Sequence, residues 1–418
     1  MRQRTNPARK IFTLALLPLG AACGLGFAGD GDQLIARRDA GHPSPDAAVT
    51  FDAGQVQPGP DSGAAPDAGQ PRDAGQPKDA GQPQDAGHQQ DGDSNLPAGP
   101  CDLYATGNTP CVAAHSTTRA LYRAYGGNLY QVRRASDKTT KDIAVVAPGG
   151  YADAAAQDAF CTGTTCTISI IYDQSSNANH LTKTPAGGWL NNGGLEADAA
   201  AAKAKLNGHT VYGVYTTMSW DNNAGSVGYR NNHTKGVPTG DDPEALYMVA
   251  SGKHYNGYCC FDYGNAETNN KDNGKATMEA VYFGNSTQWG SGDGKGPWVM
   301  ADLEDGVYAG ASTAPAKTNT SLEVEFVTAM LKGHSGNRYA LKGGSAQSGK
   351  LTTMYDGTRP PGGYTPQRKE GAIILGVGGD NSHTGEGTFF EGCMTAGVPS
   401  DATDDAVQAN IVAAGYGR

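Results

Sequence analysis

Short runs of apolar residues, separated by clusters of Gly, Asn and Asp, extend from about residue 99 to the end of the chain. The runs are rich in β-branched and aromatic residues, which favour strands, and the residues between them favour turns. Many short strands bounded by turns predict an all-β domain, built as a β-sandwich. Representative runs are 167–172, 245–250, 278–283, 298–304 and 372–377.

Helical patterns are scarce in this domain. The segment 117–125 (TTRALYRAY) has a helical pattern, and we expect a helix there. The segment 399–414 fits either a terminal helix or a strand, and its pattern does not choose between them.

The first 22 residues have the pattern of an export signal. Basic residues precede a short apolar run, 11–19, that cannot span a bilayer, and small residues follow it. Cys23 then stands where bacterial lipoproteins carry an acylated Cys, although Gly20 occupies a position that is usually Leu. The segment therefore predicts a secreted or cell-surface protein, either tethered by a lipid at Cys23 or released by plain cleavage.

Residues 23–98 are expected to form a disordered linker. The unit Gln-Pro-x-Asp-Ala-Gly recurs with a period of six residues, so that an Asp stands at every sixth position from Asp67 to Asp85. The segment has too few apolar residues to offset the entropy of ordering, and its Gly and Pro residues suit a spacer. We therefore expect a single folded domain over residues 99–418.

The composition and net charge of the chain limit the classes of function that it can have. Gly accounts for 60 of 418 residues and charged residues for only 18%, which suits a turn-rich secreted β-domain. The formal net charge of −10 opposes phosphate binding, so we expect no nucleic-acid partner. The nine His residues show no HExxH or comparable ligand spacing, so we expect no metal and no other cofactor.

Export implies an oxidising compartment, so the cysteines after Cys23 are expected to form disulfides. Local spacing suggests that Cys101 pairs with Cys111 and that Cys161 pairs with Cys166, each pair closing a short loop.

Cys259 and Cys260 are neighbours in the chain. Their Cα atoms are only about 3.8 Å apart, which is shorter than the usual disulfide range. The two residues can bond to each other and present a flat, sulfur-lined surface, or they can pair elsewhere with Cys393 as one partner. In the first case Cys393 is a lone thiol, buried in an apolar strand.

The strand predicted over 298–304 (WVMADLE) places two carboxylates on one face. Alternate side chains of a strand share a face, so Asp302 and Glu304 lie with Trp298. In a cleft, each carboxylate raises the pKa of the other and an aromatic wall desolvates both. The pair is a candidate for acid–base or nucleophilic work on a sugar, with an ordinary solvated strand face as the alternative.

A third candidate carboxylate follows the apolar run 372–377. Gly378 and Gly379 lead directly to Asp380, so the carboxylate stands at the tip of a turn where the backbone can approach a ligand closely. A turn Asp that caps backbone amides is the alternative.

Together these motifs resemble the catalytic domain of glycoside hydrolase family 54, the α-L-arabinofuranosidase B family. The resemblance extends over residues 99–418 and rests on long runs, which are far more specific than a lone short motif. The runs are GPCDLY at 99, TPCVAAHSTTRALY at 109, IIYDQSSNANHLT at 170, GYRNN at 228, CCFDYGNAET at 259, GNSTQWG at 284, GPWVMADLE at 296, EGAIILGVGGDNS at 370 and EGTFFEG at 386.

The resemblance implies a lectin-like (concanavalin-like) jelly-roll sandwich that hydrolyses terminal α-L-arabinofuranosyl groups with retention. It maps the nucleophile to Glu304 and the acid/base to Asp380. Asp305 stands where familiar fungal members have Asn, which can alter a substrate hydrogen bond. The implied sugar contacts are a Cys259–Cys260 disulfide, Trp289, Asp302, Asp305, Gly379 and Asn381.

The expected function is therefore the release of L-arabinofuranose from arabinose-containing polysaccharides or oligosaccharides by double displacement. One alternative is a non-catalytic arabinose-binding lectin on the same fold, because fold alone does not imply activity. Another is an enzyme that also cleaves β-xylosides. Contact with a membrane is expected only through the lipid anchor at Cys23.

Overall fold

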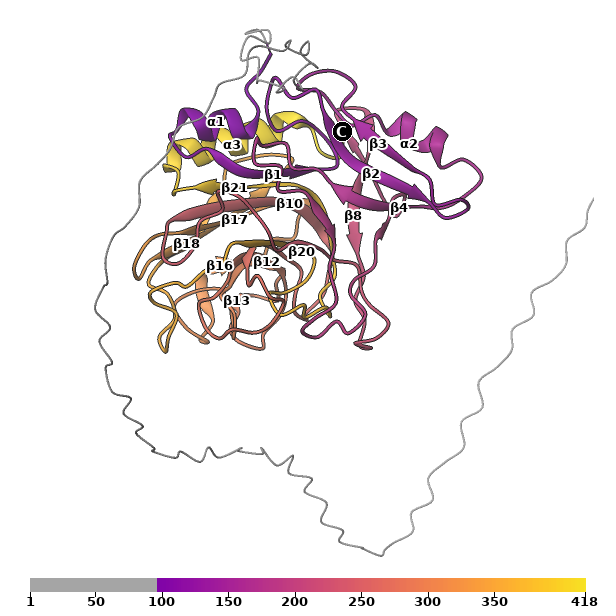
Figure 1. The fold of residues 1–418 in the computed structure, drawn as a ribbon. Helices are drawn as coiled ribbons and strands as arrows, with labels where there is room; N and C mark the ends of the chain where they lie inside the picture. The colour runs from indigo at the N-terminus through magenta and orange to yellow at the C-terminus, as the bar shows by residue number, and fades with distance from the viewer. Residues whose placement is uncertain (1–95) are drawn as a thin grey trace, which may run out of the picture. The chain divides into compact units, whose positions relative to one another are not determined.

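The computed structural model describes residues 96–418. The export signal predicted for residues 1–22, the anchor at Cys23 and nearly all of the linker predicted for 23–98 lie outside the described residues. Within them, two large antiparallel β-sheets lie face to face (Figure 1), so the prediction of an all-β sandwich is confirmed. No helix within residues 96–418 has the length and apolar character needed to cross a membrane.

The first sheet has eight strands. Its order is β19 (Thr352–Gly357), β18 (Tyr339–Ser345), β17 (Phe326–Gly333), β10 (Glu244–Tyr255), β21 (Gly387–Ala396), β8 (His209–Thr216) and β7 (Ala202–Leu206), with β1 (Cys111–Ser116) also paired to β21.

The second sheet has eleven strands. Its order is β15 (Val307–Tyr308), β14 (Trp298–Asp302), β12 (Glu279–Gly284), β11 (Asp262–Ala266), β20 (Ala372–Leu375), β9 (Tyr229–Asn231), β5 (Leu181–Lys183), β4 (Cys166–Ile171), β2 (Asn128–Arg134) and β3 (Thr140–Ala144), with β6 (Ala197–Asp198) paired to β4. A separate parallel pair joins β13 (Gly292–Asp293) to β16 (Ala316–Thr320).

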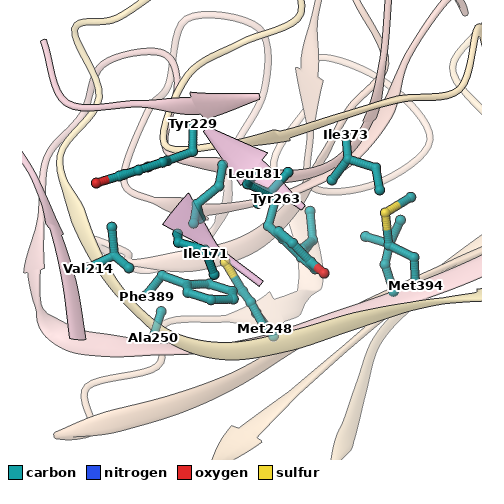
Figure 2. Close-up of a cluster of buried hydrophobic side chains, with 14 of the residues drawn as sticks. Ile171, Leu181, Val214, Tyr229, Met248, Ala250, Tyr263, Ile373, Phe389 and Met394 are labelled. Atoms are coloured by element: carbon teal, nitrogen blue, oxygen red, sulfur yellow. The ribbon is translucent and has the colours of Figure 1, made fainter. Parts of the chain in front are cut away.

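The main hydrophobic core lies between the two sheets. Figure 2 shows part of it, where Met248 and Phe389 of the first sheet meet Tyr263 and Ile373 of the second. All four side chains are fully buried. Burial of an aliphatic or aromatic side chain of this size contributes about 1.5–3 kcal/mol, so this interface is the main source of the stability of the sandwich.

The outer face of the first sheet is covered by two helices, α1 (Pro100–Thr106) and α3 (Asp401–Ala414), as Figure 1 shows. Ser400 caps the N-terminus of α3 through a bond from the Thr403 amide (3.2 Å), and Gly415 ends it in the left-handed conformation. The segment 399–414, which the sequence left open, is therefore mostly helix. The third helix, α2 (Ala154–Phe160), lies at the end of the second sheet near β3 and β4.

The five apolar runs chosen from the sequence overlap β4, β10, β12, β14 and β20, although β14 and β20 each end two residues before the predicted run does. The helix predicted over 117–125 is wrong. Its amides bond to distant parts of the chain, such as Ala120 to the Gly150 carbonyl (2.9 Å) and Leu121 to the Gln174 side chain (2.7 Å). These tertiary partners replace the local bonds of a helix, because the segment is buried beneath other elements.

A buried ion network joins the two sheets to a long loop. Arg359 bonds to Glu279 (2.9 Å), and Lys369 bridges Glu279 and Glu244 (3.2 Å to each), with all four side chains almost completely inaccessible. Although burial raises the pKa of Glu279, Lys369 and Arg359 outweigh that effect and hold it below its usual range.

Arg359→Met is expected to destabilise the domain by about 3–5 kcal/mol, because it leaves the buried Glu279 carboxylate without one of its two cationic partners. Equilibrium unfolding in urea measures the loss. The matched control is Arg338→Met, which removes an exposed pair with Asp356 (2.7 Å) and is expected to have a much smaller effect. Equal losses in the two variants would contradict this account of the network.

Candidate active site

Glu304 lies in the turn after β14, not on the strand as side-chain alternation predicted. The strand ends at Asp302, and a bond from the Leu303 amide to the Gly306 carbonyl (3.1 Å) closes the turn into β15. Glu304 and Asp305 adopt left-handed backbone conformations, with φ of 59° and 53°. Such conformations cost about 1–3 kcal/mol for a residue other than Gly and concentrate at functional sites.

The strand itself has the two faces that the sequence predicted. Val299 and Ala301 lie in the core between the sheets, whereas Asp302 points to the outer face. Asp302 Oδ1 accepts a bond from the Glu304 amide (3.1 Å), and its Oδ2 lies 3.0 Å from Cys260 Sγ. Asp302 therefore links the Glu304 turn to the cysteine pair.

Asp380 stands at the tip of the turn that follows β20, as predicted. The Asn381 amide donates to the Gly378 carbonyl (3.1 Å) and closes the turn. Asp380 Oδ1 accepts a bond from the Ser382 amide (2.8 Å), which fixes the side chain.

Asn381 is buried behind this turn, and it is not among the residues that line the pocket described below. Its side chain is fully buried and donates to the carbonyls of Pro185 (3.1 Å) and Gly187 (3.0 Å). Its Oδ1 accepts from Arg230 (3.0 Å), which also donates to the Gly379 carbonyl (2.7 Å). Asn381 therefore supports the Asp380 turn from behind.

The two turns open into one pocket of about 510 Å³ on the outer face of the second sheet. This volume is within the range of small-molecule sites. Seven of the nine residues proposed from the sequence for catalysis or sugar contact line it: Cys259, Trp289, Asp302, Glu304, Asp305, Gly379 and Asp380.

Cys259 and Cys260 are joined by a disulfide in the structure. Cys259 faces the pocket, while Cys260 is buried behind it and belongs to an outer hydrophobic cluster against which Trp289 packs. The sulfur surface and the indole ring therefore form one wall of the pocket. Further disulfides link Cys101 to Cys111 and Cys161 to Cys166, and Cys393 is a buried free thiol.

Gly379 lies beside two carboxyl groups, those of Glu267 and Glu304. A Cβ atom at this position would collide with Glu267 Oε2 and would lie only 2.7 Å from Glu304 Oε2. A side chain at position 379 would therefore displace the Glu267 and Glu304 carboxyl groups from their places beside the Asp380 turn.

The site concentrates negative charge in a buried setting. Burial raises the pKa of Glu304 to about 12, and the neighbouring carboxylates of Glu267, Asp302 and Asp380 add to the effect. Burial likewise raises the pKa of Asp302 to about 7 and that of Glu267 to about 7. Carboxyl groups this close and this buried retain protons, so Glu267 favours the neutral form of Glu304.

Sequence reasoning missed three charged residues of this site: Asp262, Glu267 and Arg230. A signal existed for Asp262, because it alternates in β11 with the core residue Tyr263 and so points to the outer face. Arg230 alternates in the same way with a core tyrosine in β9. Glu267 follows the end of β11, and no local pattern marks it.

Arg230 is the buried cation that holds these parts together. Besides its bonds to the Asp380 turn, it donates to the backbone carbonyl of Glu267. Burial lowers its pKa to about 10, against the pull of Glu267 and Glu304. It still carries its charge at neutral pH, so it offsets part of the repulsion among the carboxylates.

One group of potential metal ligands lies beside the pocket. Ligand atoms of Cys259, Cys260, Asp262 and Asp302 all lie within 4.8 Å of one another. A thiolate, not a disulfide sulfur, binds a metal, and the two cysteines are bonded to each other. Asp262 and Asp302 therefore remain as the two potential ligands of this group. Burial raises the pKa of Asp262 well above its usual range, and Asp302 raises it further.

Glu267→Gln is expected to lower the pKa of Glu304, because it removes the adjacent negative charge and supplies an amide that can donate to the carboxylate. An activity that needs the ionised form of Glu304 increases as the pH rises through the pKa of Glu304. The acidic limb of the kcat/KM profile is therefore expected to move to lower pH, by about one unit or more.

The matched control is Glu370→Gln, which changes a carboxylate outside the pocket that is bonded to Thr268 and Asn273. Its profile is expected to match that of the unchanged protein. An acidic limb that does not move in Glu267→Gln would contradict the influence of Glu267 on the pKa of Glu304.

The fold and the site together define a β-sandwich protein with an acidic pocket suited to hydrolysing a glycosidic bond. Residues 100–417 match the family model described as "Alpha-L-arabinofuranosidase B, catalytic", and the chain belongs to this family.

Curated relatives agree with this assignment. The chain is 56% identical over 324 residues to a probable alpha-L-arabinofuranosidase B of Aspergillus terreus, a match that covers 76% of this chain and 62% of the relative. It is 56% identical over 328 residues to an arabinofuranosidase/B-xylosidase of Trichoderma koningii, covering 77% and 64%. The chain thus spans less than two thirds of the length of these relatives.

Two solved structures are also similar. A GH54 α-L-arabinofuranosidase soaked with a cyclic sulfate inhibitor matches with 52% identity and a TM-score of 0.73, covering 76% of this chain and 66% of that one. An arabinofuranosidase complexed with arabinofuranosyl-α-1,2-xylobiose matches with 52% identity and a TM-score of 0.72, covering 76% and 65%.

Proposed function

We propose that this chain is a retaining, exo-acting α-L-arabinofuranosidase that releases terminal L-arabinofuranose from arabinose-containing polysaccharides or oligosaccharides. The observation that carries the proposal is that Glu304 and Asp380, on turns far apart in the sequence, line one pocket. Family membership and the names of the relatives support the same activity.

In the first step, the ionised Glu304 attacks the anomeric carbon and the bond from that carbon to the leaving oxygen breaks. Asp380 donates its proton to that oxygen, which leaves as an alcohol. An arabinosyl ester of Glu304 results.

In the second step, Asp380 takes a proton from water, and the resulting nucleophile displaces Glu304 from the anomeric carbon. Two inversions give net retention, which requires the two carboxyl groups to lie only about 5–5.5 Å apart around the bound sugar. Cys259 and Trp289 offer an apolar wall for the furanose ring, and Asp302 offers an acceptor for its hydroxyls.

Turnover of an aryl α-L-arabinofuranoside, followed by proton NMR of the first-formed sugar, tests the proposal. We expect the α-anomer to appear first and to equilibrate afterwards with its β-anomer. Release of the β-anomer first would exclude a covalent Glu304 intermediate, and absence of turnover would favour an arabinose-binding lectin.

A second activity, on β-xylosides, is supported by one relative, whose name combines arabinofuranosidase with B-xylosidase. Aryl β-xylosides in the same assay test it. The Glu304→Gln variant shows whether both activities use one site.

We also propose that the chain is exported and tethered through an acylated Cys23. The support is the sequence pattern of residues 1–23 alone. Cys23→Ser should move the protein from the membrane fraction to the soluble fraction, and an unchanged distribution would leave plain cleavage as the explanation.

A further inference from the structure

Three large aromatic side chains are exposed at the mouth of the pocket. Trp189, Trp220 and Tyr258 are 56%, 64% and 48% accessible, and all three line the pocket. The other large apolar side chains exposed among residues 96–418, Val146 and Leu195, do not line it. Clustered apolar surface that stays exposed to water is typical of a binding site. We call Trp189, Trp220 and Tyr258 the aromatic rim.

The rim is an organised surface and not three separate side chains. Trp220 and Tyr258 meet edge to face, with ring centroids 4.8 Å apart and ring planes at 82°. This arrangement is favourable for two aromatic rings, and it fixes the orientation of each. A ligand that binds here therefore contacts two rings that are already held nearly perpendicular to each other.

The backbone at or next to each rim residue is hydrogen-bonded to the turn 380–384, which carries Asp380. The Trp189 amide donates to the Asp380 carbonyl (3.0 Å). The amide of the residue before Trp220 donates to a carbonyl of this turn (3.3 Å), and an amide of the turn donates to the carbonyl of the residue after Tyr258 (3.0 Å). The rim is thus built around the turn of the proposed acid.

The position of the acid decides which part of a substrate faces the rim. A general acid must lie within hydrogen-bond reach of the oxygen that leaves, so the leaving group occupies the Asp380 side of the pocket. In an exo-acting enzyme that removes one side group, the leaving group is the main chain of the polymer. Trp289 and Cys259, in contrast, form the wall assigned above to the furanose ring.

We propose that the aromatic rim is the leaving-group subsite and that it stacks the pyranose rings of a neutral polysaccharide main chain carrying the arabinofuranosyl group. This rests on the proposed function. A pyranose presents a flat face of C–H groups that complements an aromatic ring, whereas a furanose is smaller and more puckered. The rim also adjoins the acidic residues Asp272 and Asp305, which disfavour a main chain rich in carboxylates.

The test compares the full chain with Trp220→Ala on two substrates. Methyl α-L-arabinofuranoside has no ring in its leaving group, and an arabinofuranosylated xylo-oligosaccharide has pyranose rings. We expect kcat/KM on the oligosaccharide to fall about tenfold more than on the methyl glycoside, mainly through KM. Trp220→Phe should recover most of the kcat/KM lost on the oligosaccharide. Leu195→Ala, which changes an exposed apolar residue outside the pocket, should leave kcat/KM on both substrates unchanged.

Equal losses on the two substrates would overturn the proposal, because they would indicate a structural effect or a contact with the arabinose. No loss on either would overturn it as well. An equal loss on an arabinofuranosylated arabino-oligosaccharide, whose main chain consists of furanose rings, would overturn the assignment to pyranoses. Failure of the unchanged protein on every arabinofuranoside would instead reject the proposed function.

Discussion

Glu304→Gln is expected to lower kcat on every arabinofuranoside by on the order of 10⁴–10⁶-fold, because no other residue can form the covalent intermediate. The amide has nearly the same shape as the carboxyl, and the raised pKa of Glu304 favours its neutral form, so the fold should not change. Arabinose binding should persist, since Cys259, Trp289 and Asp302 remain. Steady-state kinetics and calorimetric titration with arabinose measure the two effects.

Loss of activity together with loss of binding would point to a collapsed pocket and not to a missing nucleophile. An unfolding curve that matches the unchanged protein is therefore the required control. Residual turnover within tenfold of the unchanged protein would contradict the assignment of Glu304.

Asp380→Asn is expected to lower activity to different extents on different substrates, according to the leaving group of each. Substrates with alcohol leaving groups need protonation and should lose on the order of 10²–10⁴-fold in kcat/KM. An activated aryl leaving group needs little protonation, so the first step should survive while the second slows for lack of a base. A burst of phenolate followed by slow turnover is the expected time course, and stopped-flow absorbance measures it.

Azide provides the control for this variant, because it attacks the arabinosyl-enzyme without needing a base. It should restore turnover of the aryl substrate and give an arabinosyl azide. Equal losses on alcohol and aryl leaving groups, with no effect of azide, would contradict an acid/base role for Asp380.

The sequence predicted most of the sandwich because strand formation here follows local patterns. The apolar runs 245–250 and 372–377 are bounded by turn residues, and both are strands in the structure. The helix at 117–125 failed because its residues bond to partners far away in the chain, which a local pattern does not contain. The order of the strands likewise depends on pairings between distant segments, such as β11 with β20.

The site was only partly accessible from the sequence. Asp302 follows strand alternation, but Glu304 is positioned by a left-handed turn that breaks it. The double-Gly turn after an apolar run made Asp380 a candidate, whereas only family resemblance pointed to Trp289. Glu267 could not be found because its role depends on the space that Gly379 leaves between two carboxyls, and that contact is purely tertiary.

Covalent labelling tests directly whether Glu304 is the nucleophile of a double displacement. The full chain is incubated with an arabinofuranose-configured covalent inhibitor and digested, and the labelled peptide is mapped by tandem mass spectrometry. We expect one label per chain, on Glu304, and none in Glu304→Gln. A label on Glu267 or Asp380, or no label while hydrolysis proceeds with inversion, would contradict it.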